Sequence, residues 1–164
     1  MTAPSAGSLV SSVPGGIMLD DGFSTVIQFS ALPTVKFKEK TVQPPGIDGG
    51  DKIPTTTMFN TLWSTFAARQ LQELTDASTT VAYDPDVYSD AQITTALLNV
   101  EQTVTIHFPD GSTLAFFGYL KSFIPQSHEE GSQPEADIVI VPTNRDTASP
   151  YGEEGPVMTE VSGT

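Results

Sequence analysis

Apolar and polar residues alternate along much of the chain with the period of two that is typical of β-strands. The clearest alternation is in Thr103–Phe108, where every second residue is apolar and a Pro-Asp-Gly-Ser turn follows. We expect Thr113–Ile124 to return antiparallel after that turn. A polar loop over residues 126–135 then leads to a further predicted strand, Ala136–Val141. This half of the chain therefore predicts a small antiparallel sheet.

The N-terminal half carries weaker strand patterns. Asp21-Gly22 stands between short apolar runs and predicts a first hairpin over residues 17–29. Val35–Val42 is predicted as a strand with three lysines on one face, and Thr79–Tyr83 as a short strand. The lysines are Lys36, Lys38 and Lys40. They fit either of two roles, a docking face for an acidic partner such as another copy of this chain, or protection of an edge strand.

One helix is predicted, over about residues 89–98. Ser89 and Gln92 form a capping-box pattern, and Ile93 and Leu97 lie on one helical face. The apolar residues of Phe59–Leu74 also come near helical spacing, and its aromatic side chains, Trp63 among them, are expected to fill the core.

The remaining segments lack periodicity. Gln43–Pro54 contains three Pro and three Gly, so we predict a long loop over residues 43–57. Residues 1–16 and 143–164 are predicted to be flexible N- and C-terminal arms, which leaves one domain over residues 17–142.

Thr113–Ile124 is apolar on both faces, which requires a cover on each side. Leu114, Phe116, Leu120 and Ile124 alternate with Ala115, Phe117, Tyr119 and Phe123. We therefore expect a second layer or another subunit to pack against these strands. The residues predicted to make this packing are Phe116, Phe117, Tyr119, Ile138 and Ile140.

The composition of the chain disfavours several classes of function. The chain has 164 residues, no Cys and a formal net charge of −13. Generic nucleic-acid binding is disfavoured by this charge, and a disulfide framework or thiolate metal site is excluded. The apolar runs are too short to span a bilayer, and no signal peptide is predicted, so we expect no membrane association.

No arrangement of residues predicts catalysis. The best carboxylate pairs, Asp48 with Asp51 and Asp84 with Asp86, are expected by chance among twenty acidic residues. His107 and His128 lack metal-ligand spacing. Gly46–Lys52 lacks the spacing of a phosphate-binding loop. We predict no catalytic residue, no metal and no cofactor.

An ordered series of motifs resembles the tail tube, or major tail, proteins of long-tailed bacteriophages. It runs through GIDGGDKIPTTTM at residues 46–58, TVAYDP at 80–85, VEQTVTIHFPDG at 100–111, TLAFFGYLKS at 113–122 and IVIVPTNRD at 138–146. The resemblance implies a β-sandwich or barrel flanked by a helix, and a largely extended Phe59–Leu74 segment with at most a short helix.

The resemblance also implies an assembly. Six copies would form a ring, and stacked rings would make a hollow conduit through which DNA passes without specific binding. The implied partners are further copies of the chain and tape measure, tail terminator and tail tip proteins. The implied location is the virion tail, with assembly in the host cytoplasm.

Two expectations follow for such a tube. The loop over 43–57 and the terminal arms would reach the adjacent ring, with basic residues such as Lys52 facing acids such as Glu153. The predicted inter-ring residues are Lys36, Lys38, Ile47, Asp48, Asp51 and Lys52. Six copies would carry a formal charge of −78, and acidic groups in the lumen would repel DNA phosphates.

Two other classes stay open. One is the inner tube of a contractile injection or secretion system. The other is a secreted β-sandwich module that binds carbohydrate, which would show clustered aromatic residues on one sheet face.

Overall fold

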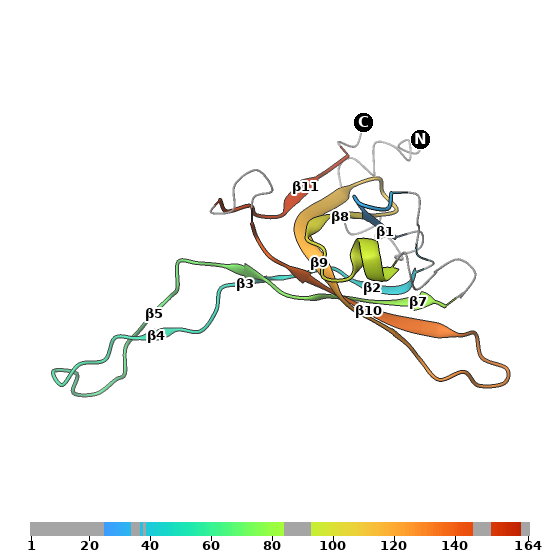
Figure 1. Ribbon diagram of the computed structural model, residues 1–164. Coiled ribbons are helices and arrows are strands. Elements are labelled where there is room, and N and C mark those ends of the chain that lie inside the picture. Colours follow the sequence, from blue (N-terminus) through green and yellow to red (C-terminus); the bar gives the residue numbers. More distant parts are fainter. Residues whose placement is uncertain (1–24, 34–36, 38, 84–92, 146–151, 162–164) are drawn as a thin grey trace, which may run out of the picture.

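The computed structural model describes residues 25–33, 37, 39–83, 93–145 and 152–161. Most of the strands form one antiparallel sheet in the order β1-β8-β9-β10-β7-β2, and β11 pairs with β9 (Figure 1). These strands are β1 (Val26–Phe29), β2 (Glu39–Gln43), β7 (Ala77–Ala82), β8 (Gln102–His107), β9 (Thr113–Pro125), β10 (Glu135–Pro142) and β11 (Val157–Thr159).

The three strands predicted after residue 102 are confirmed, whereas residues 17–24 of the predicted first hairpin lie outside the described residues. β8 and β9 form the expected hairpin, with Val104 opposite Phe116, and β10 pairs with β9 on its other side. In the β8–β9 turn, Ser112 donates its backbone N–H to the Asp110 carboxylate over 2.8 Å. Hydrogen bonds from Ser112 hold the pKa of Asp110 below its ordinary value.

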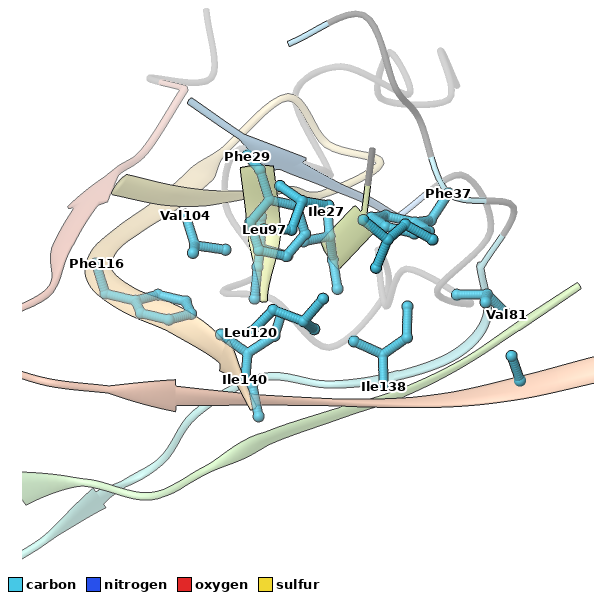
Figure 2. Packing of buried hydrophobic residues seen from close by; sticks show 14 of the residues in the cluster. Ile27, Phe29, Phe37, Val81, Leu97, Val104, Phe116, Leu120, Ile138 and Ile140 are labelled. Carbon is cyan, nitrogen blue, oxygen red and sulfur yellow. The ribbon is translucent and has the colours of Figure 1, made fainter. Parts of the chain in front are cut away.

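The core lies on the inward face of this curled sheet. Alternate residues of β1, β8, β9, β10 and β7 converge there, and the short helix η1 (Ile93–Leu97) packs against them (Figure 2). The side chains that are almost completely buried are Ile27, Phe29, Val81, Leu97, Val104, Ile106, Leu120, Ile138 and Ile140. A single sheet and one helical turn thus enclose the core.

The described part of the predicted helix, Ile93–Leu97, differs in type from the α-helix that the sequence predicts. η1 is a π-helix, in which the N–H of Leu98 donates to the carbonyl of Ile93 over 2.9 Å. Asn99 then adopts a positive φ of 57° and donates its N–H to Leu120, which ends the helix on the sheet. Ile93 and Leu97 are buried as expected, and Ser89 lies outside the described residues.

The sheet is open and does not close into the barrel that the resemblance allowed. Its two edge strands nevertheless approach each other, because the backbone N–H of Ile27 in β1 donates to a carboxylate oxygen of Glu39 in β2 over 2.8 Å. Phe29 and Phe37 also meet edge to face. Burial raises the pKa of Glu39 above its ordinary value.

An irregularity in β9 changes which residues face the core. The register with β10 shifts between Val139 and Ile140, so that Lys121 has no opposite residue. The alternation reverses beyond it: Phe123 packs against the core, and Ile124 is exposed. The expectation that Ile124 shares a face with Leu120 is therefore wrong.

A long two-limbed arm replaces the predicted loop over 43–57. Residues 44–76 leave the sheet after β2 and return into β7, and short strand pairs hold the limbs together (Figure 1). The pairs are β3 (Ile47–Asp48) with β6 (Glu73–Leu74), and β4 (Ile53–Pro54) with β5 (Phe66–Ala67). Phe59–Leu74 contains no helix, and its aromatic side chains are exposed where the sequence predicted burial; Leu74 at its end is partly buried and packs against the core.

The described part of the C-terminal segment, residues 152–161, contributes a strand to the sheet. β11 pairs with the first residues of β9, with Met158 opposite Leu114. Ahead of it, Glu154 donates its N–H to the carbonyl of Asn144 over 3.1 Å. The segment after residue 143 is thus partly joined to the sheet.

Candidate assembly surface

The arm is the most exposed part of the molecule. Every residue from 46 to 73 is exposed to solvent, although the backbone is hydrogen-bonded at intervals along its length. At the base, Thr75 donates its N–H to the carbonyl of Gly46 over 2.9 Å. Further out, Thr55 donates to the carbonyl of Thr65, also over 2.9 Å. The arm therefore has a defined backbone without a core of its own.

Polar side chains shape the tip, residues 55–65. The side-chain oxygen of Asn60 accepts from the N–H of Thr57 over 2.9 Å, and its amide donates to the carbonyl of Trp63 over 3.1 Å. The hydroxyl of Thr56 accepts from the N–H of Thr65 over 2.9 Å. These short polar side chains satisfy the backbone of the turn.

The apolar side chains of the tip are directed outward. Trp63 has a relative exposure of 81% and Phe59 one of 94%, whereas a buried aromatic side chain normally falls below a few per cent. Met58 and Leu62 are exposed to the same degree. A cluster of large apolar side chains on a polar scaffold is typical of a surface that another molecule covers.

Two basic residues lie on the outer part of the limbs, whereas Asp48, Asp51 and Glu73 lie on the inner part. From Lys52 to Gln72 the sequence has two basic residues and no acidic one, in a chain with a net charge of −13. The ammonium of Lys52 lies 3.8 Å from the centre of the Phe66 ring. The side chain of Arg69 crosses Gly50, which has a φ of 69°. The outer arm is thus apolar and cationic.

A groove of about 380 Å³ lies beside the base of the arm. Its walls are the returning limb and the segment ahead of β11. The apolar lining residues are Ile47, Leu71, Leu74 and Pro156, and the charged ones are all acidic: Glu73, Glu153 and Glu154. The groove therefore pairs apolar surface with negative charge.

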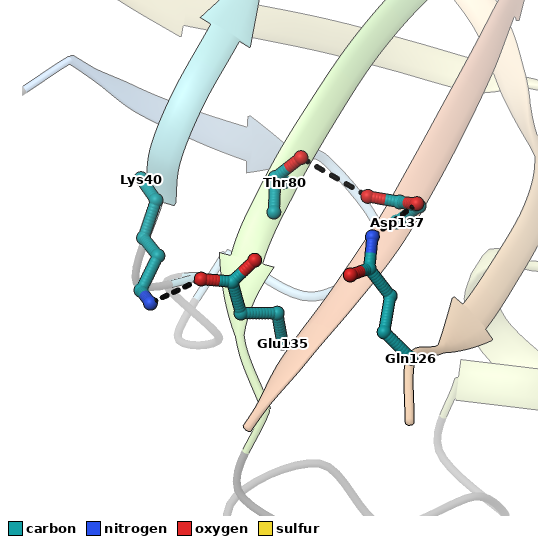
Figure 3. A network of polar contacts seen from close by, with 5 residues as sticks. All are labelled: Lys40, Thr80, Gln126, Glu135 and Asp137. Carbon is teal, nitrogen blue, oxygen red and sulfur yellow. Dashed lines mark hydrogen bonds and ion pairs between the residues drawn. The ribbon is translucent and has the colours of Figure 1, made fainter. Parts of the chain in front are cut away.

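The outer face of the sheet carries a polar network. Lys40 in β2 forms an ion pair with Glu135 in β10, and Asp137 accepts hydrogen bonds from Thr80 and Gln126 (Figure 3). Lys40 thus lies on the sheet, away from the arm. Lys36 and Lys38 lie outside the described residues.

The other residues of the predicted inter-ring contact occur together on one limb of the arm. Ile47, Asp48, Asp51 and Lys52 are all exposed, and the Asp48 carboxylate accepts from the N–H of Gly50 over 2.8 Å. Asp48 therefore shapes the turn at Gly50 in addition to any contact that it makes.

The residues predicted to pack against a second layer or subunit divide into two groups. Phe116, Ile138 and Ile140 are buried in the core of the chain itself. Phe117 and Tyr119 lie on the opposite face of β9 and are partly exposed. Only this second group is available to a neighbouring subunit.

The apolar tip was missed by the sequence analysis. Its spacing resembles that of an amphipathic helix, and this favoured burial. A signal does exist in the sequence, because the apolar residues lie between threonines and an asparagine in a stretch free of acids. These features separate the tip from the alternating strands of the core.

The two histidines considered as candidates for metal binding lie on separate parts of the described structure. Within the described residues, no three His, Asp or Glu side chains are close enough to hold a metal ion. His107 contacts the Gln28 amide, and His128 packs against Tyr83. Asp84 and Asp86 lie outside the described part of the chain. Across the same described ranges, no helix is long and apolar enough to cross a membrane.

Three solved structures contain a chain of similar fold. A chain of an extracellular contractile injection system, in a sheath–tube complex in the extended state, has a TM-score of 0.59 at 13% identity, with 92% of this chain and 97% of that chain covered. The virion of a native gene transfer agent gives 0.55 at 10% identity, covering 87% and 100%. The baseplate of the anti-feeding prophage gives 0.54 at 8% identity, covering 84% and 92%.

The chain shares its fold with subunits of these particles. No family model matches the sequence, and no curated protein matches it. The likeness extends over most of each matched chain despite very low identity. It agrees with the resemblance to tail tube proteins that the ordered motifs indicate.

Proposed function

We propose that the chain is a structural, non-enzymatic subunit of a phage-tail-type tube. Six copies form a ring, rings stack into a hollow tube, and the arm of each subunit contacts a neighbouring subunit. The observation that carries this proposal is the arm, because between residues 46 and 73 it exposes large apolar side chains on an ordered backbone and contributes no buried residue to the core. The shared fold supports the same role.

The sheet offers a second contact surface. Among the described residues its edge strands, β1 and β2, each pair with one strand only, and Phe117 and Tyr119 are partly exposed on its outer face. Joining such edges between copies removes an aggregation hazard and closes a ring when the rotation divides a full turn. In this proposal the acidic groups of the chain give the lumen a negative charge that repels DNA.

The subunit would act in the virion tail after assembly in the host cytoplasm. Tape measure, tail terminator and tail tip proteins would be its other partners. An inner tube of a contractile injection system is the second candidate, favoured by the 0.59 TM-score against a chain of such a system. A carbohydrate-binding module is less well supported, because the most exposed aromatic side chains lie on the arm.

Negative-stain electron microscopy of the purified chain tests the proposal. We expect rings with six-fold symmetry or tubes as concentration rises, and the Phe59→Ser, Trp63→Ser double variant should remain unassembled. Thr61→Ser is the matched control, since it alters a tip residue without removing apolar surface. A wild-type chain that stays monomeric at high concentration, with or without preformed tail tips, would contradict the proposal.

The lumen charge is tested separately, on a reconstruction of the assembled tube. A negative inner wall is expected. A neutral or positive wall would contradict the repulsion of DNA and leave the tube itself intact.

A further inference from the structure

We propose that the acidic groove at the base of one arm receives the apolar tip of the arm of a second copy. The groove is the one lined by Ile47, residues 70–74, Asn144 and residues 153–156, and the tip is residues 55–65. The inference rests on the proposed function and adds to it the receptor for the arm.

The tip has the properties of a ligand. Asn60 and Thr56 hydrogen-bond the backbone of Thr57, Trp63 and Thr65, so these polar groups already have partners within the tip. Its large apolar side chains have none of the cover that such residues normally receive. The energetic gain from covering it is therefore hydrophobic, and an ordered tip loses little conformational freedom on binding.

The groove has the properties of the matching receptor. Its volume of about 380 Å³ is within the range of pockets that enclose a compact apolar group. Leu71 in its wall has a relative exposure of 79% and Ile47 one of 67%, so both are available for contact. An aromatic anchor such as Trp63 entering an apolar pocket is a common centre of a protein interface.

The acidic side chains of the groove favour a partner segment that carries no negative charge. Glu73, Glu153 and Glu154 line the groove and disfavour an acidic partner. The chain as a whole is strongly acidic, and its outer arm, with Lys52 and Arg69 and no acid, is an exception to that charge. The arm of another copy thus provides apolar side chains without adding negative charge, and its cations favour approach to an acidic body.

Geometry requires the two surfaces to come from different copies. The arm extends away from the sheet and ends in the tip (Figure 1). The residues that line the groove belong to the base of the arm and to the segment ahead of β11. The thirteen residues from Gly46 to Met58, if fully extended, span up to about 40 Å. A tip of one copy in the groove of the next is a head-to-tail contact, and repeated head-to-tail contacts build rings or open stacks.

The absence of cysteine allows a direct test by disulfide trapping. One population of full-length chain carries Thr61→Cys at the tip, and a second carries Gln72→Cys in the groove. Both residues are exposed, and both substitutions leave the large apolar side chains in place. The two populations are mixed under assembly conditions, oxidised and analysed on a non-reducing gel. Thr61→Cys mixed with Thr103→Cys, an exposed position on β8, is the matched control.

We expect a covalent dimer of Thr61→Cys with Gln72→Cys at several times the level of the control pair. If rings or tubes form and this dimer stays at the control level, the inference is wrong while the proposed function stands. If Gln72→Cys is instead trapped by a chain with Ser8→Cys, the N-terminal segment occupies the groove, and the inference is again wrong. If the wild-type chain never assembles, the proposed function fails as well.

Charge reversal gives a second measurement. The Lys52→Glu, Arg69→Glu variant should assemble at least severalfold more slowly than wild type, with the difference shrinking at high salt. Adding Glu153→Lys and Glu154→Lys should restore most of the rate. Assembly of the first variant at the wild-type rate would contradict the role given to charge.

Discussion

The sheet and the arm differ in where their large apolar side chains lie: those of the sheet are buried, and those of the arm are exposed. In the sheet, alternate residues of neighbouring strands converge on η1 and enclose one another, so that Leu120 and Ile140 have no exposed surface. In the arm, polar side chains hold the backbone, and Phe59 and Trp63 remain in water. The comparison indicates that the sheet stabilises the free subunit, whereas the arm leaves large apolar side chains exposed for the association proposed above.

This division can be tested by comparing how substitutions in the sheet and in the arm change the free energy of unfolding of the free subunit. The largest effect is expected for Leu120→Ala, because it opens a cavity beneath η1. We expect a loss of about 2–5 kcal/mol in urea unfolding. Leu62→Ala, the same change at the tip, should fall within about 0.5 kcal/mol of wild type. Similar losses at the two positions would contradict the division.

The second-largest loss in the free energy of unfolding is expected for Gly118→Ala. A Cβ at Gly118 would lie 2.5 Å from the carbonyl oxygen of Val141 on the neighbouring strand, so the backbone of β9 or β10 must shift. We expect a loss of about 1–3 kcal/mol, measured by thermal or urea unfolding. Gly49→Ala in the arm has nothing within 4 Å of the added carbon and is the control. An unchanged melting temperature for Gly118→Ala would show that the two strands separate more easily than the structure indicates.

Glu39 tests how the open sheet is held together. Glu39→Ala removes the acceptor of the Ile27 N–H and should cost about 1–3 kcal/mol. Glu39→Gln keeps an acceptor and removes the buried charge, so it should be at least as stable as wild type at neutral pH. A glutamine less stable than alanine would rule out the hydrogen bond as the cause.

The same residue gives a pH dependence. Because the pKa of Glu39 is raised in the folded state, folding disfavours the ionised form. The ionised Glu39 carboxylate therefore lowers the free energy of unfolding at pH values above the raised pKa. This loss of stability disappears at pH values below the unfolded pKa of about 4.5. The advantage of Glu39→Gln over wild type should therefore shrink as pH falls through this range. An advantage that grows at low pH would contradict the direction of the pKa shift.

The smallest effect on unfolding is expected for the Phe59→Ser, Trp63→Ser variant, because both side chains are already in water. Its free energy of unfolding should lie within about 0.5 kcal/mol of wild type. Its sedimentation profile should in contrast lose the assembled species. A large loss of stability in the free subunit would mean that the tip packs against its own chain.

The sequence was most informative where burial repeats with a regular period. β8, β9 and β10 follow from alternation, and Ile93 and Leu97 from one helical face. Three features escaped it for physical reasons. The π-helical hydrogen bond is set by packing on the sheet, and the irregularity at Lys121 depends on the partner strand. The pairing of the two limbs into one arm depends on contacts between segments that are far apart in sequence, although the resemblance to tail tube proteins did imply a largely extended Phe59–Leu74.

The candidate surface was anticipated only in its position. The Gly- and Pro-rich stretch near Ile47 and Lys52 was expected to contact another subunit, and it forms one limb of the arm. The returning limb, with Trp63, was assigned to the core, because local spacing does not distinguish an apolar face that covers the same chain from one that covers a neighbour.

Hydrogen–deuterium exchange of the arm, measured by mass spectrometry on free subunits and on assembled particles, tests the division most directly. We predict that peptides spanning residues 55–65 exchange faster than β9 and β10 in the free subunit and become strongly protected on assembly, while the core strands change little. Assembled particles in which residues 55–65 exchange as fast as in the free subunit would contradict the account.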